Sequence, residues 1–231
     1  MLTHKHIVIF APPRSGTKLL ANILEDFGYF KHGEWFALQT TKIKGNKSIR
    51  AEPDVNIANI VSRSEKQFYT LQESMKRFRL FKNIDKHEKS VITLWPNYLI
   101  EFPLMIYEFT EYHWLCIRRD PLEQMLSYYI SSKNSNFDGL KISQSVTFKE
   151  DAFRQMYWNY HSACTLQDWL IENKSATLID FNELIQGKLT TFGQSYEIKS
   201  KDEHTNLESL VENLDDVKSW YDKFEVTRLK N

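Results

Sequence analysis

The segment from Ala11 to Lys18, which reads APPRSGTK, has the residue types of an anion-binding loop. An apolar run precedes it and a helical pattern follows it, so the backbone amides of residues 15–18 can point together at an anion, helped by the helix dipole. The loop departs from the Walker A pattern, because Ala11 stands at the first glycine position and Thr17 separates Gly16 from Lys18. The sequence predicts an anion cradle, and an ATPase or GTPase is disfavoured.

Apolar runs that alternate with helical patterns must position this loop. We expect strands over 6–11, 90–94, 113–117 and 176–180, helices starting near 17, at 121 and over 149–172, and an amphipathic helix over 207–224. This alternation predicts an α/β fold of three layers, in which helices flank a mostly parallel central sheet and ligands bind at the carboxyl ends of the strands. We expect one domain over residues 1–231.

The remaining stretches carry little regular patterning. We expect one or two helices over 56–82, and polar loops over 31–53 and 133–147 that form the walls of an acceptor site.

A second strand-to-helix junction follows the run HWLCI. Asp120 is a good helix cap and Pro121 suits the first helical turn, so a helix is predicted to begin directly after Arg119.

The two junctions together resemble the sulfotransferases that use 3′-phosphoadenosine-5′-phosphosulfate (PAPS). In that family a basic residue followed by Ser-Gly-Thr binds the 5′-phosphosulfate, and here the segment is Arg14, Ser15, Gly16 and Thr17. The family also has a strand ending in Arg, then Asp or Asn and Pro, with a Ser eight residues beyond the Arg. The resemblance implies a fold like that of the P-loop nucleoside-triphosphate hydrolases, with PAPS as the cofactor and adenosine 3′,5′-bisphosphate as the product.

Arg119 and Ser127 reproduce the second spacing, and the resemblance implies that they hold the 3′-phosphate. The alternative is that Arg119 pairs with an acid and Ser127 is an ordinary hydroxyl on a helix surface. The segment DFNEL at 180–184 resembles the family's Tyr-Glu-Asp-Leu segment, with Phe181 in place of the tyrosine.

The branches of this family differ in the residue that acts as the general base. Many cytosolic members carry a His where this chain has Leu94, so the steroid and phenol branch is disfavoured. A bacterial carbohydrate branch, and more distantly the tyrosylprotein enzymes, use a Glu after the first helix, which Glu34 in GEWF matches. Glu34 is therefore the first candidate for the base, and His32 is the second because its ordinary pKa suits proton transfer.

The implied reaction is in-line attack by a hydroxyl or an amine on the sulfur of PAPS. Arg14 and Lys18 would stabilise the charge on the leaving oxygen, and no metal is expected. The acceptor would be a small molecule or a carbohydrate. Two other functions stay open: a P-loop kinase that uses ATP and Mg²⁺ on a small molecule or a nucleoside, and a non-catalytic nucleotide-binding protein.

The composition indicates which kinds of partner and which compartment to expect. The chain has 30 basic residues (Lys and Arg) and 30 acidic residues (Asp and Glu), so its formal net charge is zero. No overall electrostatic field therefore favours binding to nucleic acid or to a membrane surface. The two cysteines lie in apolar patterns typical of buried free thiols, which indicates a reducing compartment. The first apolar run is too short for a signal peptide, and no stretch approaches the ~20 residues of a membrane span, so we expect a cytoplasmic protein.

Overall fold

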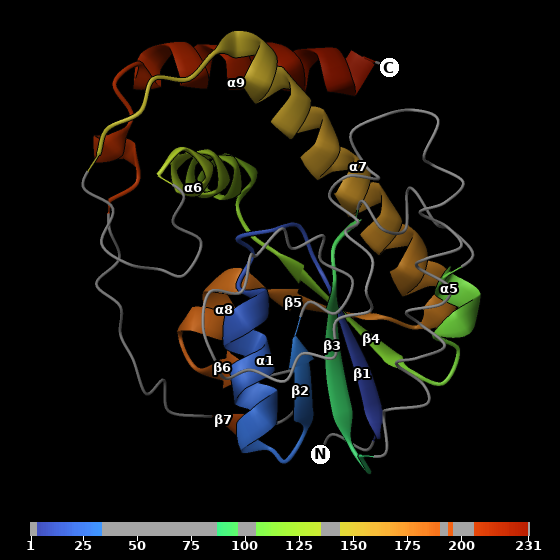
Figure 1. Ribbon diagram of the computed structural model, residues 1–231. Helices are drawn as coiled ribbons and strands as arrows, with labels where there is room; N and C mark the ends of the chain where they lie inside the picture. The colour runs from blue at the N-terminus through green and yellow to red at the C-terminus, as the bar shows by residue number, and fades with distance from the viewer. Residues whose placement is uncertain are drawn as a thin grey trace, which may run out of the picture.

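A five-stranded parallel sheet forms the centre of the fold (Figure 1). The computed structural model describes residues 4–33, 87–96, 105–134, 144–189, 194–195 and 206–230. The strands are β1 (His6–Phe10), β2 (Phe30–Gly33), β3 (Ser90–Leu94), β4 (His113–Arg118) and β5 (Thr177–Asp180), in the order β2-β3-β1-β4-β5. Every neighbouring pair is parallel, with Phe10 level with Leu94 of β3 and Cys116 of β4. The segment 11–16 directly follows β1, the central strand, and so lies at the carboxyl end of the sheet.

Both faces of β1 are buried, because its side chains alternate between two apolar clusters. Val8 and Phe10 pack with Trp114 and with Leu170 of the helix α7 (Glu150–Lys174). On the other face Ile7 and Ile9 belong to the cluster that contains apolar side chains of α1 (Thr17–Asp26) and α8 (Phe181–Ile185). These helices on opposite faces of the sheet confirm the predicted three-layer α/β fold with a P-loop-like first unit.

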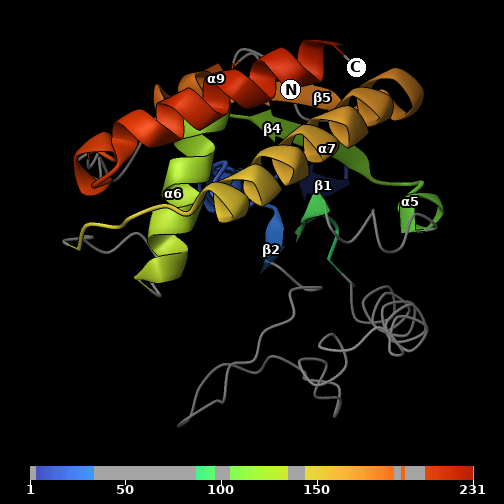
Figure 2. The ribbon, with the colours of Figure 1, turned by 90° about the horizontal axis from the view of Figure 1, so that it is seen from above.

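A third apolar cluster lies among α6 (Pro121–Lys133), α7 and α9 (Leu214–Lys230). The first half of α7 packs against α9, and seen from above α6 lies at a steep angle to both (Figure 2). The smaller elements are α5 (Met105–Glu108), a 3-10 turn (Glu208–Leu210), and β6 (Lys188–Leu189) paired with β7 (Gln194–Ser195). Among the described helices, none combines the length and the apolar character needed to cross a bilayer.

Two expectations differ from the structure. The sequence predicts a polar loop from residue 31, but residues 30–33 form the edge strand β2. This strand is stabilised by pairing with β3, and its short polar sequence FKHG has no strand pattern of its own. The last helix begins at Leu214 and not at 207, since residues 208–210 form a 3-10 turn and Val211 is extended and forms an isolated bridge with Val146. The helices expected over 56–82 lie outside the described residues.

Candidate functional site

The segment after β1 has the backbone form of an anion nest. Arg14 and Gly16 have φ angles of 68° and 88°, so two left-handed residues flank Ser15. Backbone turns of this kind bring successive N–H groups together into a concave donor surface. Gly16 is also the N-cap of α1 and provides no side-chain cap, and the first turn of α1 contains no acidic residue. The first amides of α1 are therefore not capped by a side chain.

A buried hydroxyl lies in the same turn. Ser15 is fully buried, and its Oγ has no hydrogen-bond partner among the residues that the structure describes. Buried polar atoms in folded proteins nearly always have a partner, so an exception calls for a physical explanation. An anion seated at the start of α1 would supply an acceptor for this hydroxyl.

The junction between β4 and α6 lies against this loop. Asp120 caps α6 by accepting from the amide of Glu123 at 2.9 Å, as the sequence predicts. The Arg119 side chain, which is 13% exposed, turns toward the loop and donates from Nη1 to the Arg14 carbonyl at 3.1 Å. Burial lowers the pKa of Arg119, and the Glu123 carboxylate at 3.4 Å opposes this change. Arg119 is thus a partly dehydrated cation beside the loop.

A side-chain hydrogen bond joins the two junctions directly. Arg14 donates from Nε to Ser127 Oγ at 3.1 Å, although 113 residues separate them along the chain. Ser127 is only 3% exposed, so the prediction of an ordinary hydroxyl on a helix surface is wrong. The other part of that alternative agrees with the structure, because Arg119 pairs with Glu123 at 3.4 Å. The structure therefore brings Arg14, Ser15, Arg119 and Ser127 into one group at the carboxyl end of the sheet.

Phe181 forms a floor beneath this group. Its ring is buried at the start of α8, and the Arg119 guanidinium carbon lies 4.4 Å from the ring centre. A Cβ placed on Gly16 would lie 2.9 Å from two atoms of the same ring, closer than van der Waals contact allows. Only glycine fits there without movement, and Phe181 supports both the loop and Arg119.

Three polar residues that sequence reasoning missed hold the surrounding backbone. Gln124 donates from Nε2 to the Pro13 carbonyl, and the Tyr160 hydroxyl donates to the Arg119 carbonyl at 2.6 Å. Gln167 donates from Nε2 to the carbonyls of Phe10 at 3.2 Å and Ile117 at 3.0 Å, and so connects the ends of β1 and β4. Burial raises the pKa of Tyr160, which keeps its hydroxyl a donor. Of the three, Gln167 carries a sequence signal, because it lies at helical spacing from the apolar residues Ala163 and Leu170.

Lys18 directly follows the loop, whereas the structure does not bring His32 to this group. Lys18 is exposed on the first turn of α1. His32 lies on β2 with its ring against Phe30 and His87, at centroid distances of 4.8 and 6.0 Å. Because Phe30 pairs with the first residue of β3, this aromatic contact lies toward the amino end of the sheet, away from the loop. Glu34 lies outside the described residues.

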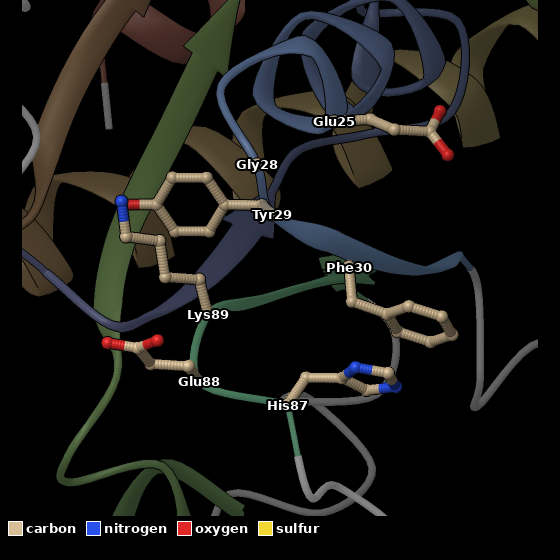
Figure 3. Close-up of a pocket in the computed structure, with 7 residues that line it drawn as sticks. All are labelled: Glu25, Gly28, Tyr29, Phe30, His87, Glu88 and Lys89. Atoms are coloured by element: carbon tan, nitrogen blue, oxygen red, sulfur yellow. The ribbon is translucent and has the colours of Figure 1, made fainter.

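An open hollow also lies at the amino end of the sheet (Figure 3). Its volume is about 580 Å³, and its lining residues are Glu25, Gly28, Tyr29, Phe30, His87, Glu88 and Lys89. The ring of His87 stacks on Phe30 at 3.6 Å between centroids. None of the lining residues belongs to the group around Arg14. Within the described ranges, no three His, Cys, Asp or Glu side chains cluster in a way that would hold a metal ion.

The similarity of this chain to known proteins lies in its fold. No protein-family model matches the chain, and no curated protein matches it. The fold is similar to that of a sulfotransferase from Alicyclobacillus acidocaldarius, with 14% sequence identity, 90% of each chain covered and a TM-score of 0.45.

Proposed function

We propose that this protein is a sulfotransferase that moves a sulfuryl group from PAPS to a hydroxyl or an amine of a small-molecule or carbohydrate acceptor. The hydrogen bond between Arg14 and Ser127 carries this proposal. The sequence resemblance assigns Arg14 to the 5′ end and Ser127 to the 3′-phosphate of one doubly phosphorylated adenosine. The bond supports the proposal because it brings the two junctions together at the carboxyl end of the sheet.

The residues present fit such a donor. The loop amides, the unpartnered Ser15 hydroxyl and Thr17 would hold the 5′ end, since all of these groups can donate hydrogen bonds. Arg119 and Ser127 would hold the 3′-phosphate, for which a guanidinium offers a planar fork of donors. The ring of Phe181 beneath Arg119 fixes the direction of that fork.

PAPS supplies the activated sulfuryl group in this proposal. Arg14 and Lys18 stabilise the negative charge that develops on the leaving oxygen, and fixed amides and cations take the place of a metal. Glu34 remains the proposed acceptor of the proton. His32 is less suited to that role, because its ring packs toward Phe30 and His87 and away from the loop.

The test is transfer of radiolabelled sulfate from PAPS to a panel of acceptors. Arg14→Ala should lower turnover by about 100-fold, the usual scale for loss of a group that stabilises developing charge. The matched control is Arg154→Ala, which removes a cation of the same type from the exposed side of α7. Normal turnover in the Arg14 variant would remove that residue from the mechanism.

Calorimetry separates the competing functions. We expect adenosine 3′,5′-bisphosphate to bind without a metal and more tightly than ATP with Mg²⁺. The reverse preference would indicate a kinase. Nucleotide binding with no transfer to any acceptor would indicate a non-catalytic nucleotide-binding protein.

A further inference from the structure

The carbonyl groups of the anion loop are held by Arg119, which follows β4, and by Gln124, in the first turn of α6. Gln124, which is 4% exposed, donates from Nε2 to the carbonyl of Pro13. Arg119 donates from Nη1 to the next carbonyl, that of Arg14, at 3.1 Å. Two successive peptide groups of the loop are therefore held from the same side.

A fixed carbonyl also fixes an amide. The peptide group is planar and trans, so each carbonyl points opposite to the N–H of the following residue. The bond from Gln124 thus sets the direction of the Arg14 amide, and the bond from Arg119 sets that of the Ser15 amide. Both N–H groups face away from the side chains that hold the carbonyls.

The loop needs this external support. Arg14 has a φ of 68°, a backbone conformation that residues with a Cβ disfavour. Gln124 and Arg119 act on the peptides at either side of Arg14. Without the bond from Gln124, the peptide between Pro13 and Arg14 can rotate and turn an oxygen lone pair toward a bound anion.

We infer that Gln124 is a positioning residue, which orients the Pro13–Arg14 peptide so that the loop presents N–H donors to its ligand. The inference deepens the proposed function and rests on it only for the identity of the anion. Gln124 itself touches the loop backbone rather than the reacting atoms.

The main test compares Gln124→Met with Ile130→Val. The first variant removes the donor at nearly constant side-chain volume, and the second removes one methyl group from a buried residue of the same helix. Inorganic pyrophosphate and adenosine 3′,5′-bisphosphate are titrated into each protein by calorimetry, with the amide NMR signals of Arg14 and Ser15 followed in parallel. Thermal unfolding of both variants gives their stability.

Gln124→Met should bind both probes about tenfold more weakly than the wild type, with the two amide signals already displaced before ligand is added. Ile130→Val should keep the wild-type affinity despite its lower stability. Unchanged affinity in the Gln124 variant would overturn the inference. An equal loss of affinity in both variants would do the same, since it would point to general loosening of α6.

Gln124→Glu adds a readout that a purely structural role would not change. The carboxylate cannot donate to Pro13, but the protonated acid can. Relative to the wild type at the same pH, its affinity for pyrophosphate should be reduced at pH 8 and partly restored at pH 5. A deficit that does not vary with pH would contradict the inference.

Wild-type measurements keep the inference testable if the variants fail to fold. The side-chain amide protons of Gln124 should exchange slowly with solvent, with and without pyrophosphate, and fast exchange would refute the bond to Pro13. A wild type that binds pyrophosphate but not adenosine 3′,5′-bisphosphate would defeat the proposed function while the role of Gln124 is still measured. A wild type that binds neither probe would overturn both.

Discussion

Replacement of Gly16 by Ala probes the packing beneath the anion loop. The φ of 88° costs a residue with a Cβ about 1–2 kcal/mol. The new methyl group would also lie 2.9 Å from two atoms of the Phe181 ring and 3.1 Å from Leu184, and such overpacking costs about 1–3 kcal/mol. Gly16→Ala should therefore lower the free energy of unfolding by about 2–5 kcal/mol.

Urea unfolding of four proteins separates these two costs. Phe181→Leu removes the ring, so Gly16→Ala should be less harmful in the Phe181→Leu background than in the wild type, by about 1–3 kcal/mol. The cost of the backbone conformation stays in both backgrounds. A loss below about 1 kcal/mol for Gly16→Ala, or no coupling in the cycle, would show that the loop does not rest on Phe181.

Three further predictions concern charge. Arg119→Ala should weaken the binding of adenosine 3′,5′-bisphosphate by about 10- to 100-fold in calorimetry, because a charged hydrogen bond contributes about 1.5–3 kcal/mol, and unchanged affinity would contradict its role. Glu123→Gln should strengthen the same binding by up to about fivefold, since it frees Arg119 from an exposed counter-charge at 3.4 Å, whereas weaker binding would count against this pairing. Burial, and to a smaller extent the neighbouring ring of His4, lowers the pKa of His113 to about 4. As the pH falls from 6.5 toward 4, His113 therefore takes up a proton in the unfolded chain and not in the folded one. The free energy of unfolding should fall over that interval, by at most about 1.4 kcal/mol per pH unit from this group, and an equally steep fall in His113→Gln would refute the assignment.

Local patterns were enough to predict much of the sheet. The strand over 90–94 has the predicted bounds, and β1 ends one residue before the predicted end. Both are short runs rich in β-branched residues and are buried along nearly their whole length, which is typical of strands covered on two faces. The start of α6 was equally clear, because Asp120 and Pro121 carry the signals of a helix start in their own chemistry.

Contacts between segments that are far apart in the sequence could not be predicted from local patterns. Gln124 and Gln167 bond to carbonyls 111 and 157 residues away, and nothing in the neighbouring sequence marks those partners. Gln167 interrupts the apolar stripe of α7, and Gln124 lies beside polar residues of α6, so neither position reveals its acceptors. The edge strand β2 was missed for a related reason, since its order comes from pairing with β3 and not from the propensity of its own residues.

The pairing of β1 with β4 restricts where residues can be inserted into this chain or deleted from it. Phe10 and Cys116 are level in adjacent strands, so the ladder between them, with its spacing of about 4.8 Å, sets the separation of the two junctions. One residue inserted after Phe10 or after Ile117 would advance one junction by about 3.3 Å and leave the other in place. Arg14 and Ser127 would then no longer meet, so insertions and deletions should be excluded at these two points even where the surrounding composition is free to change.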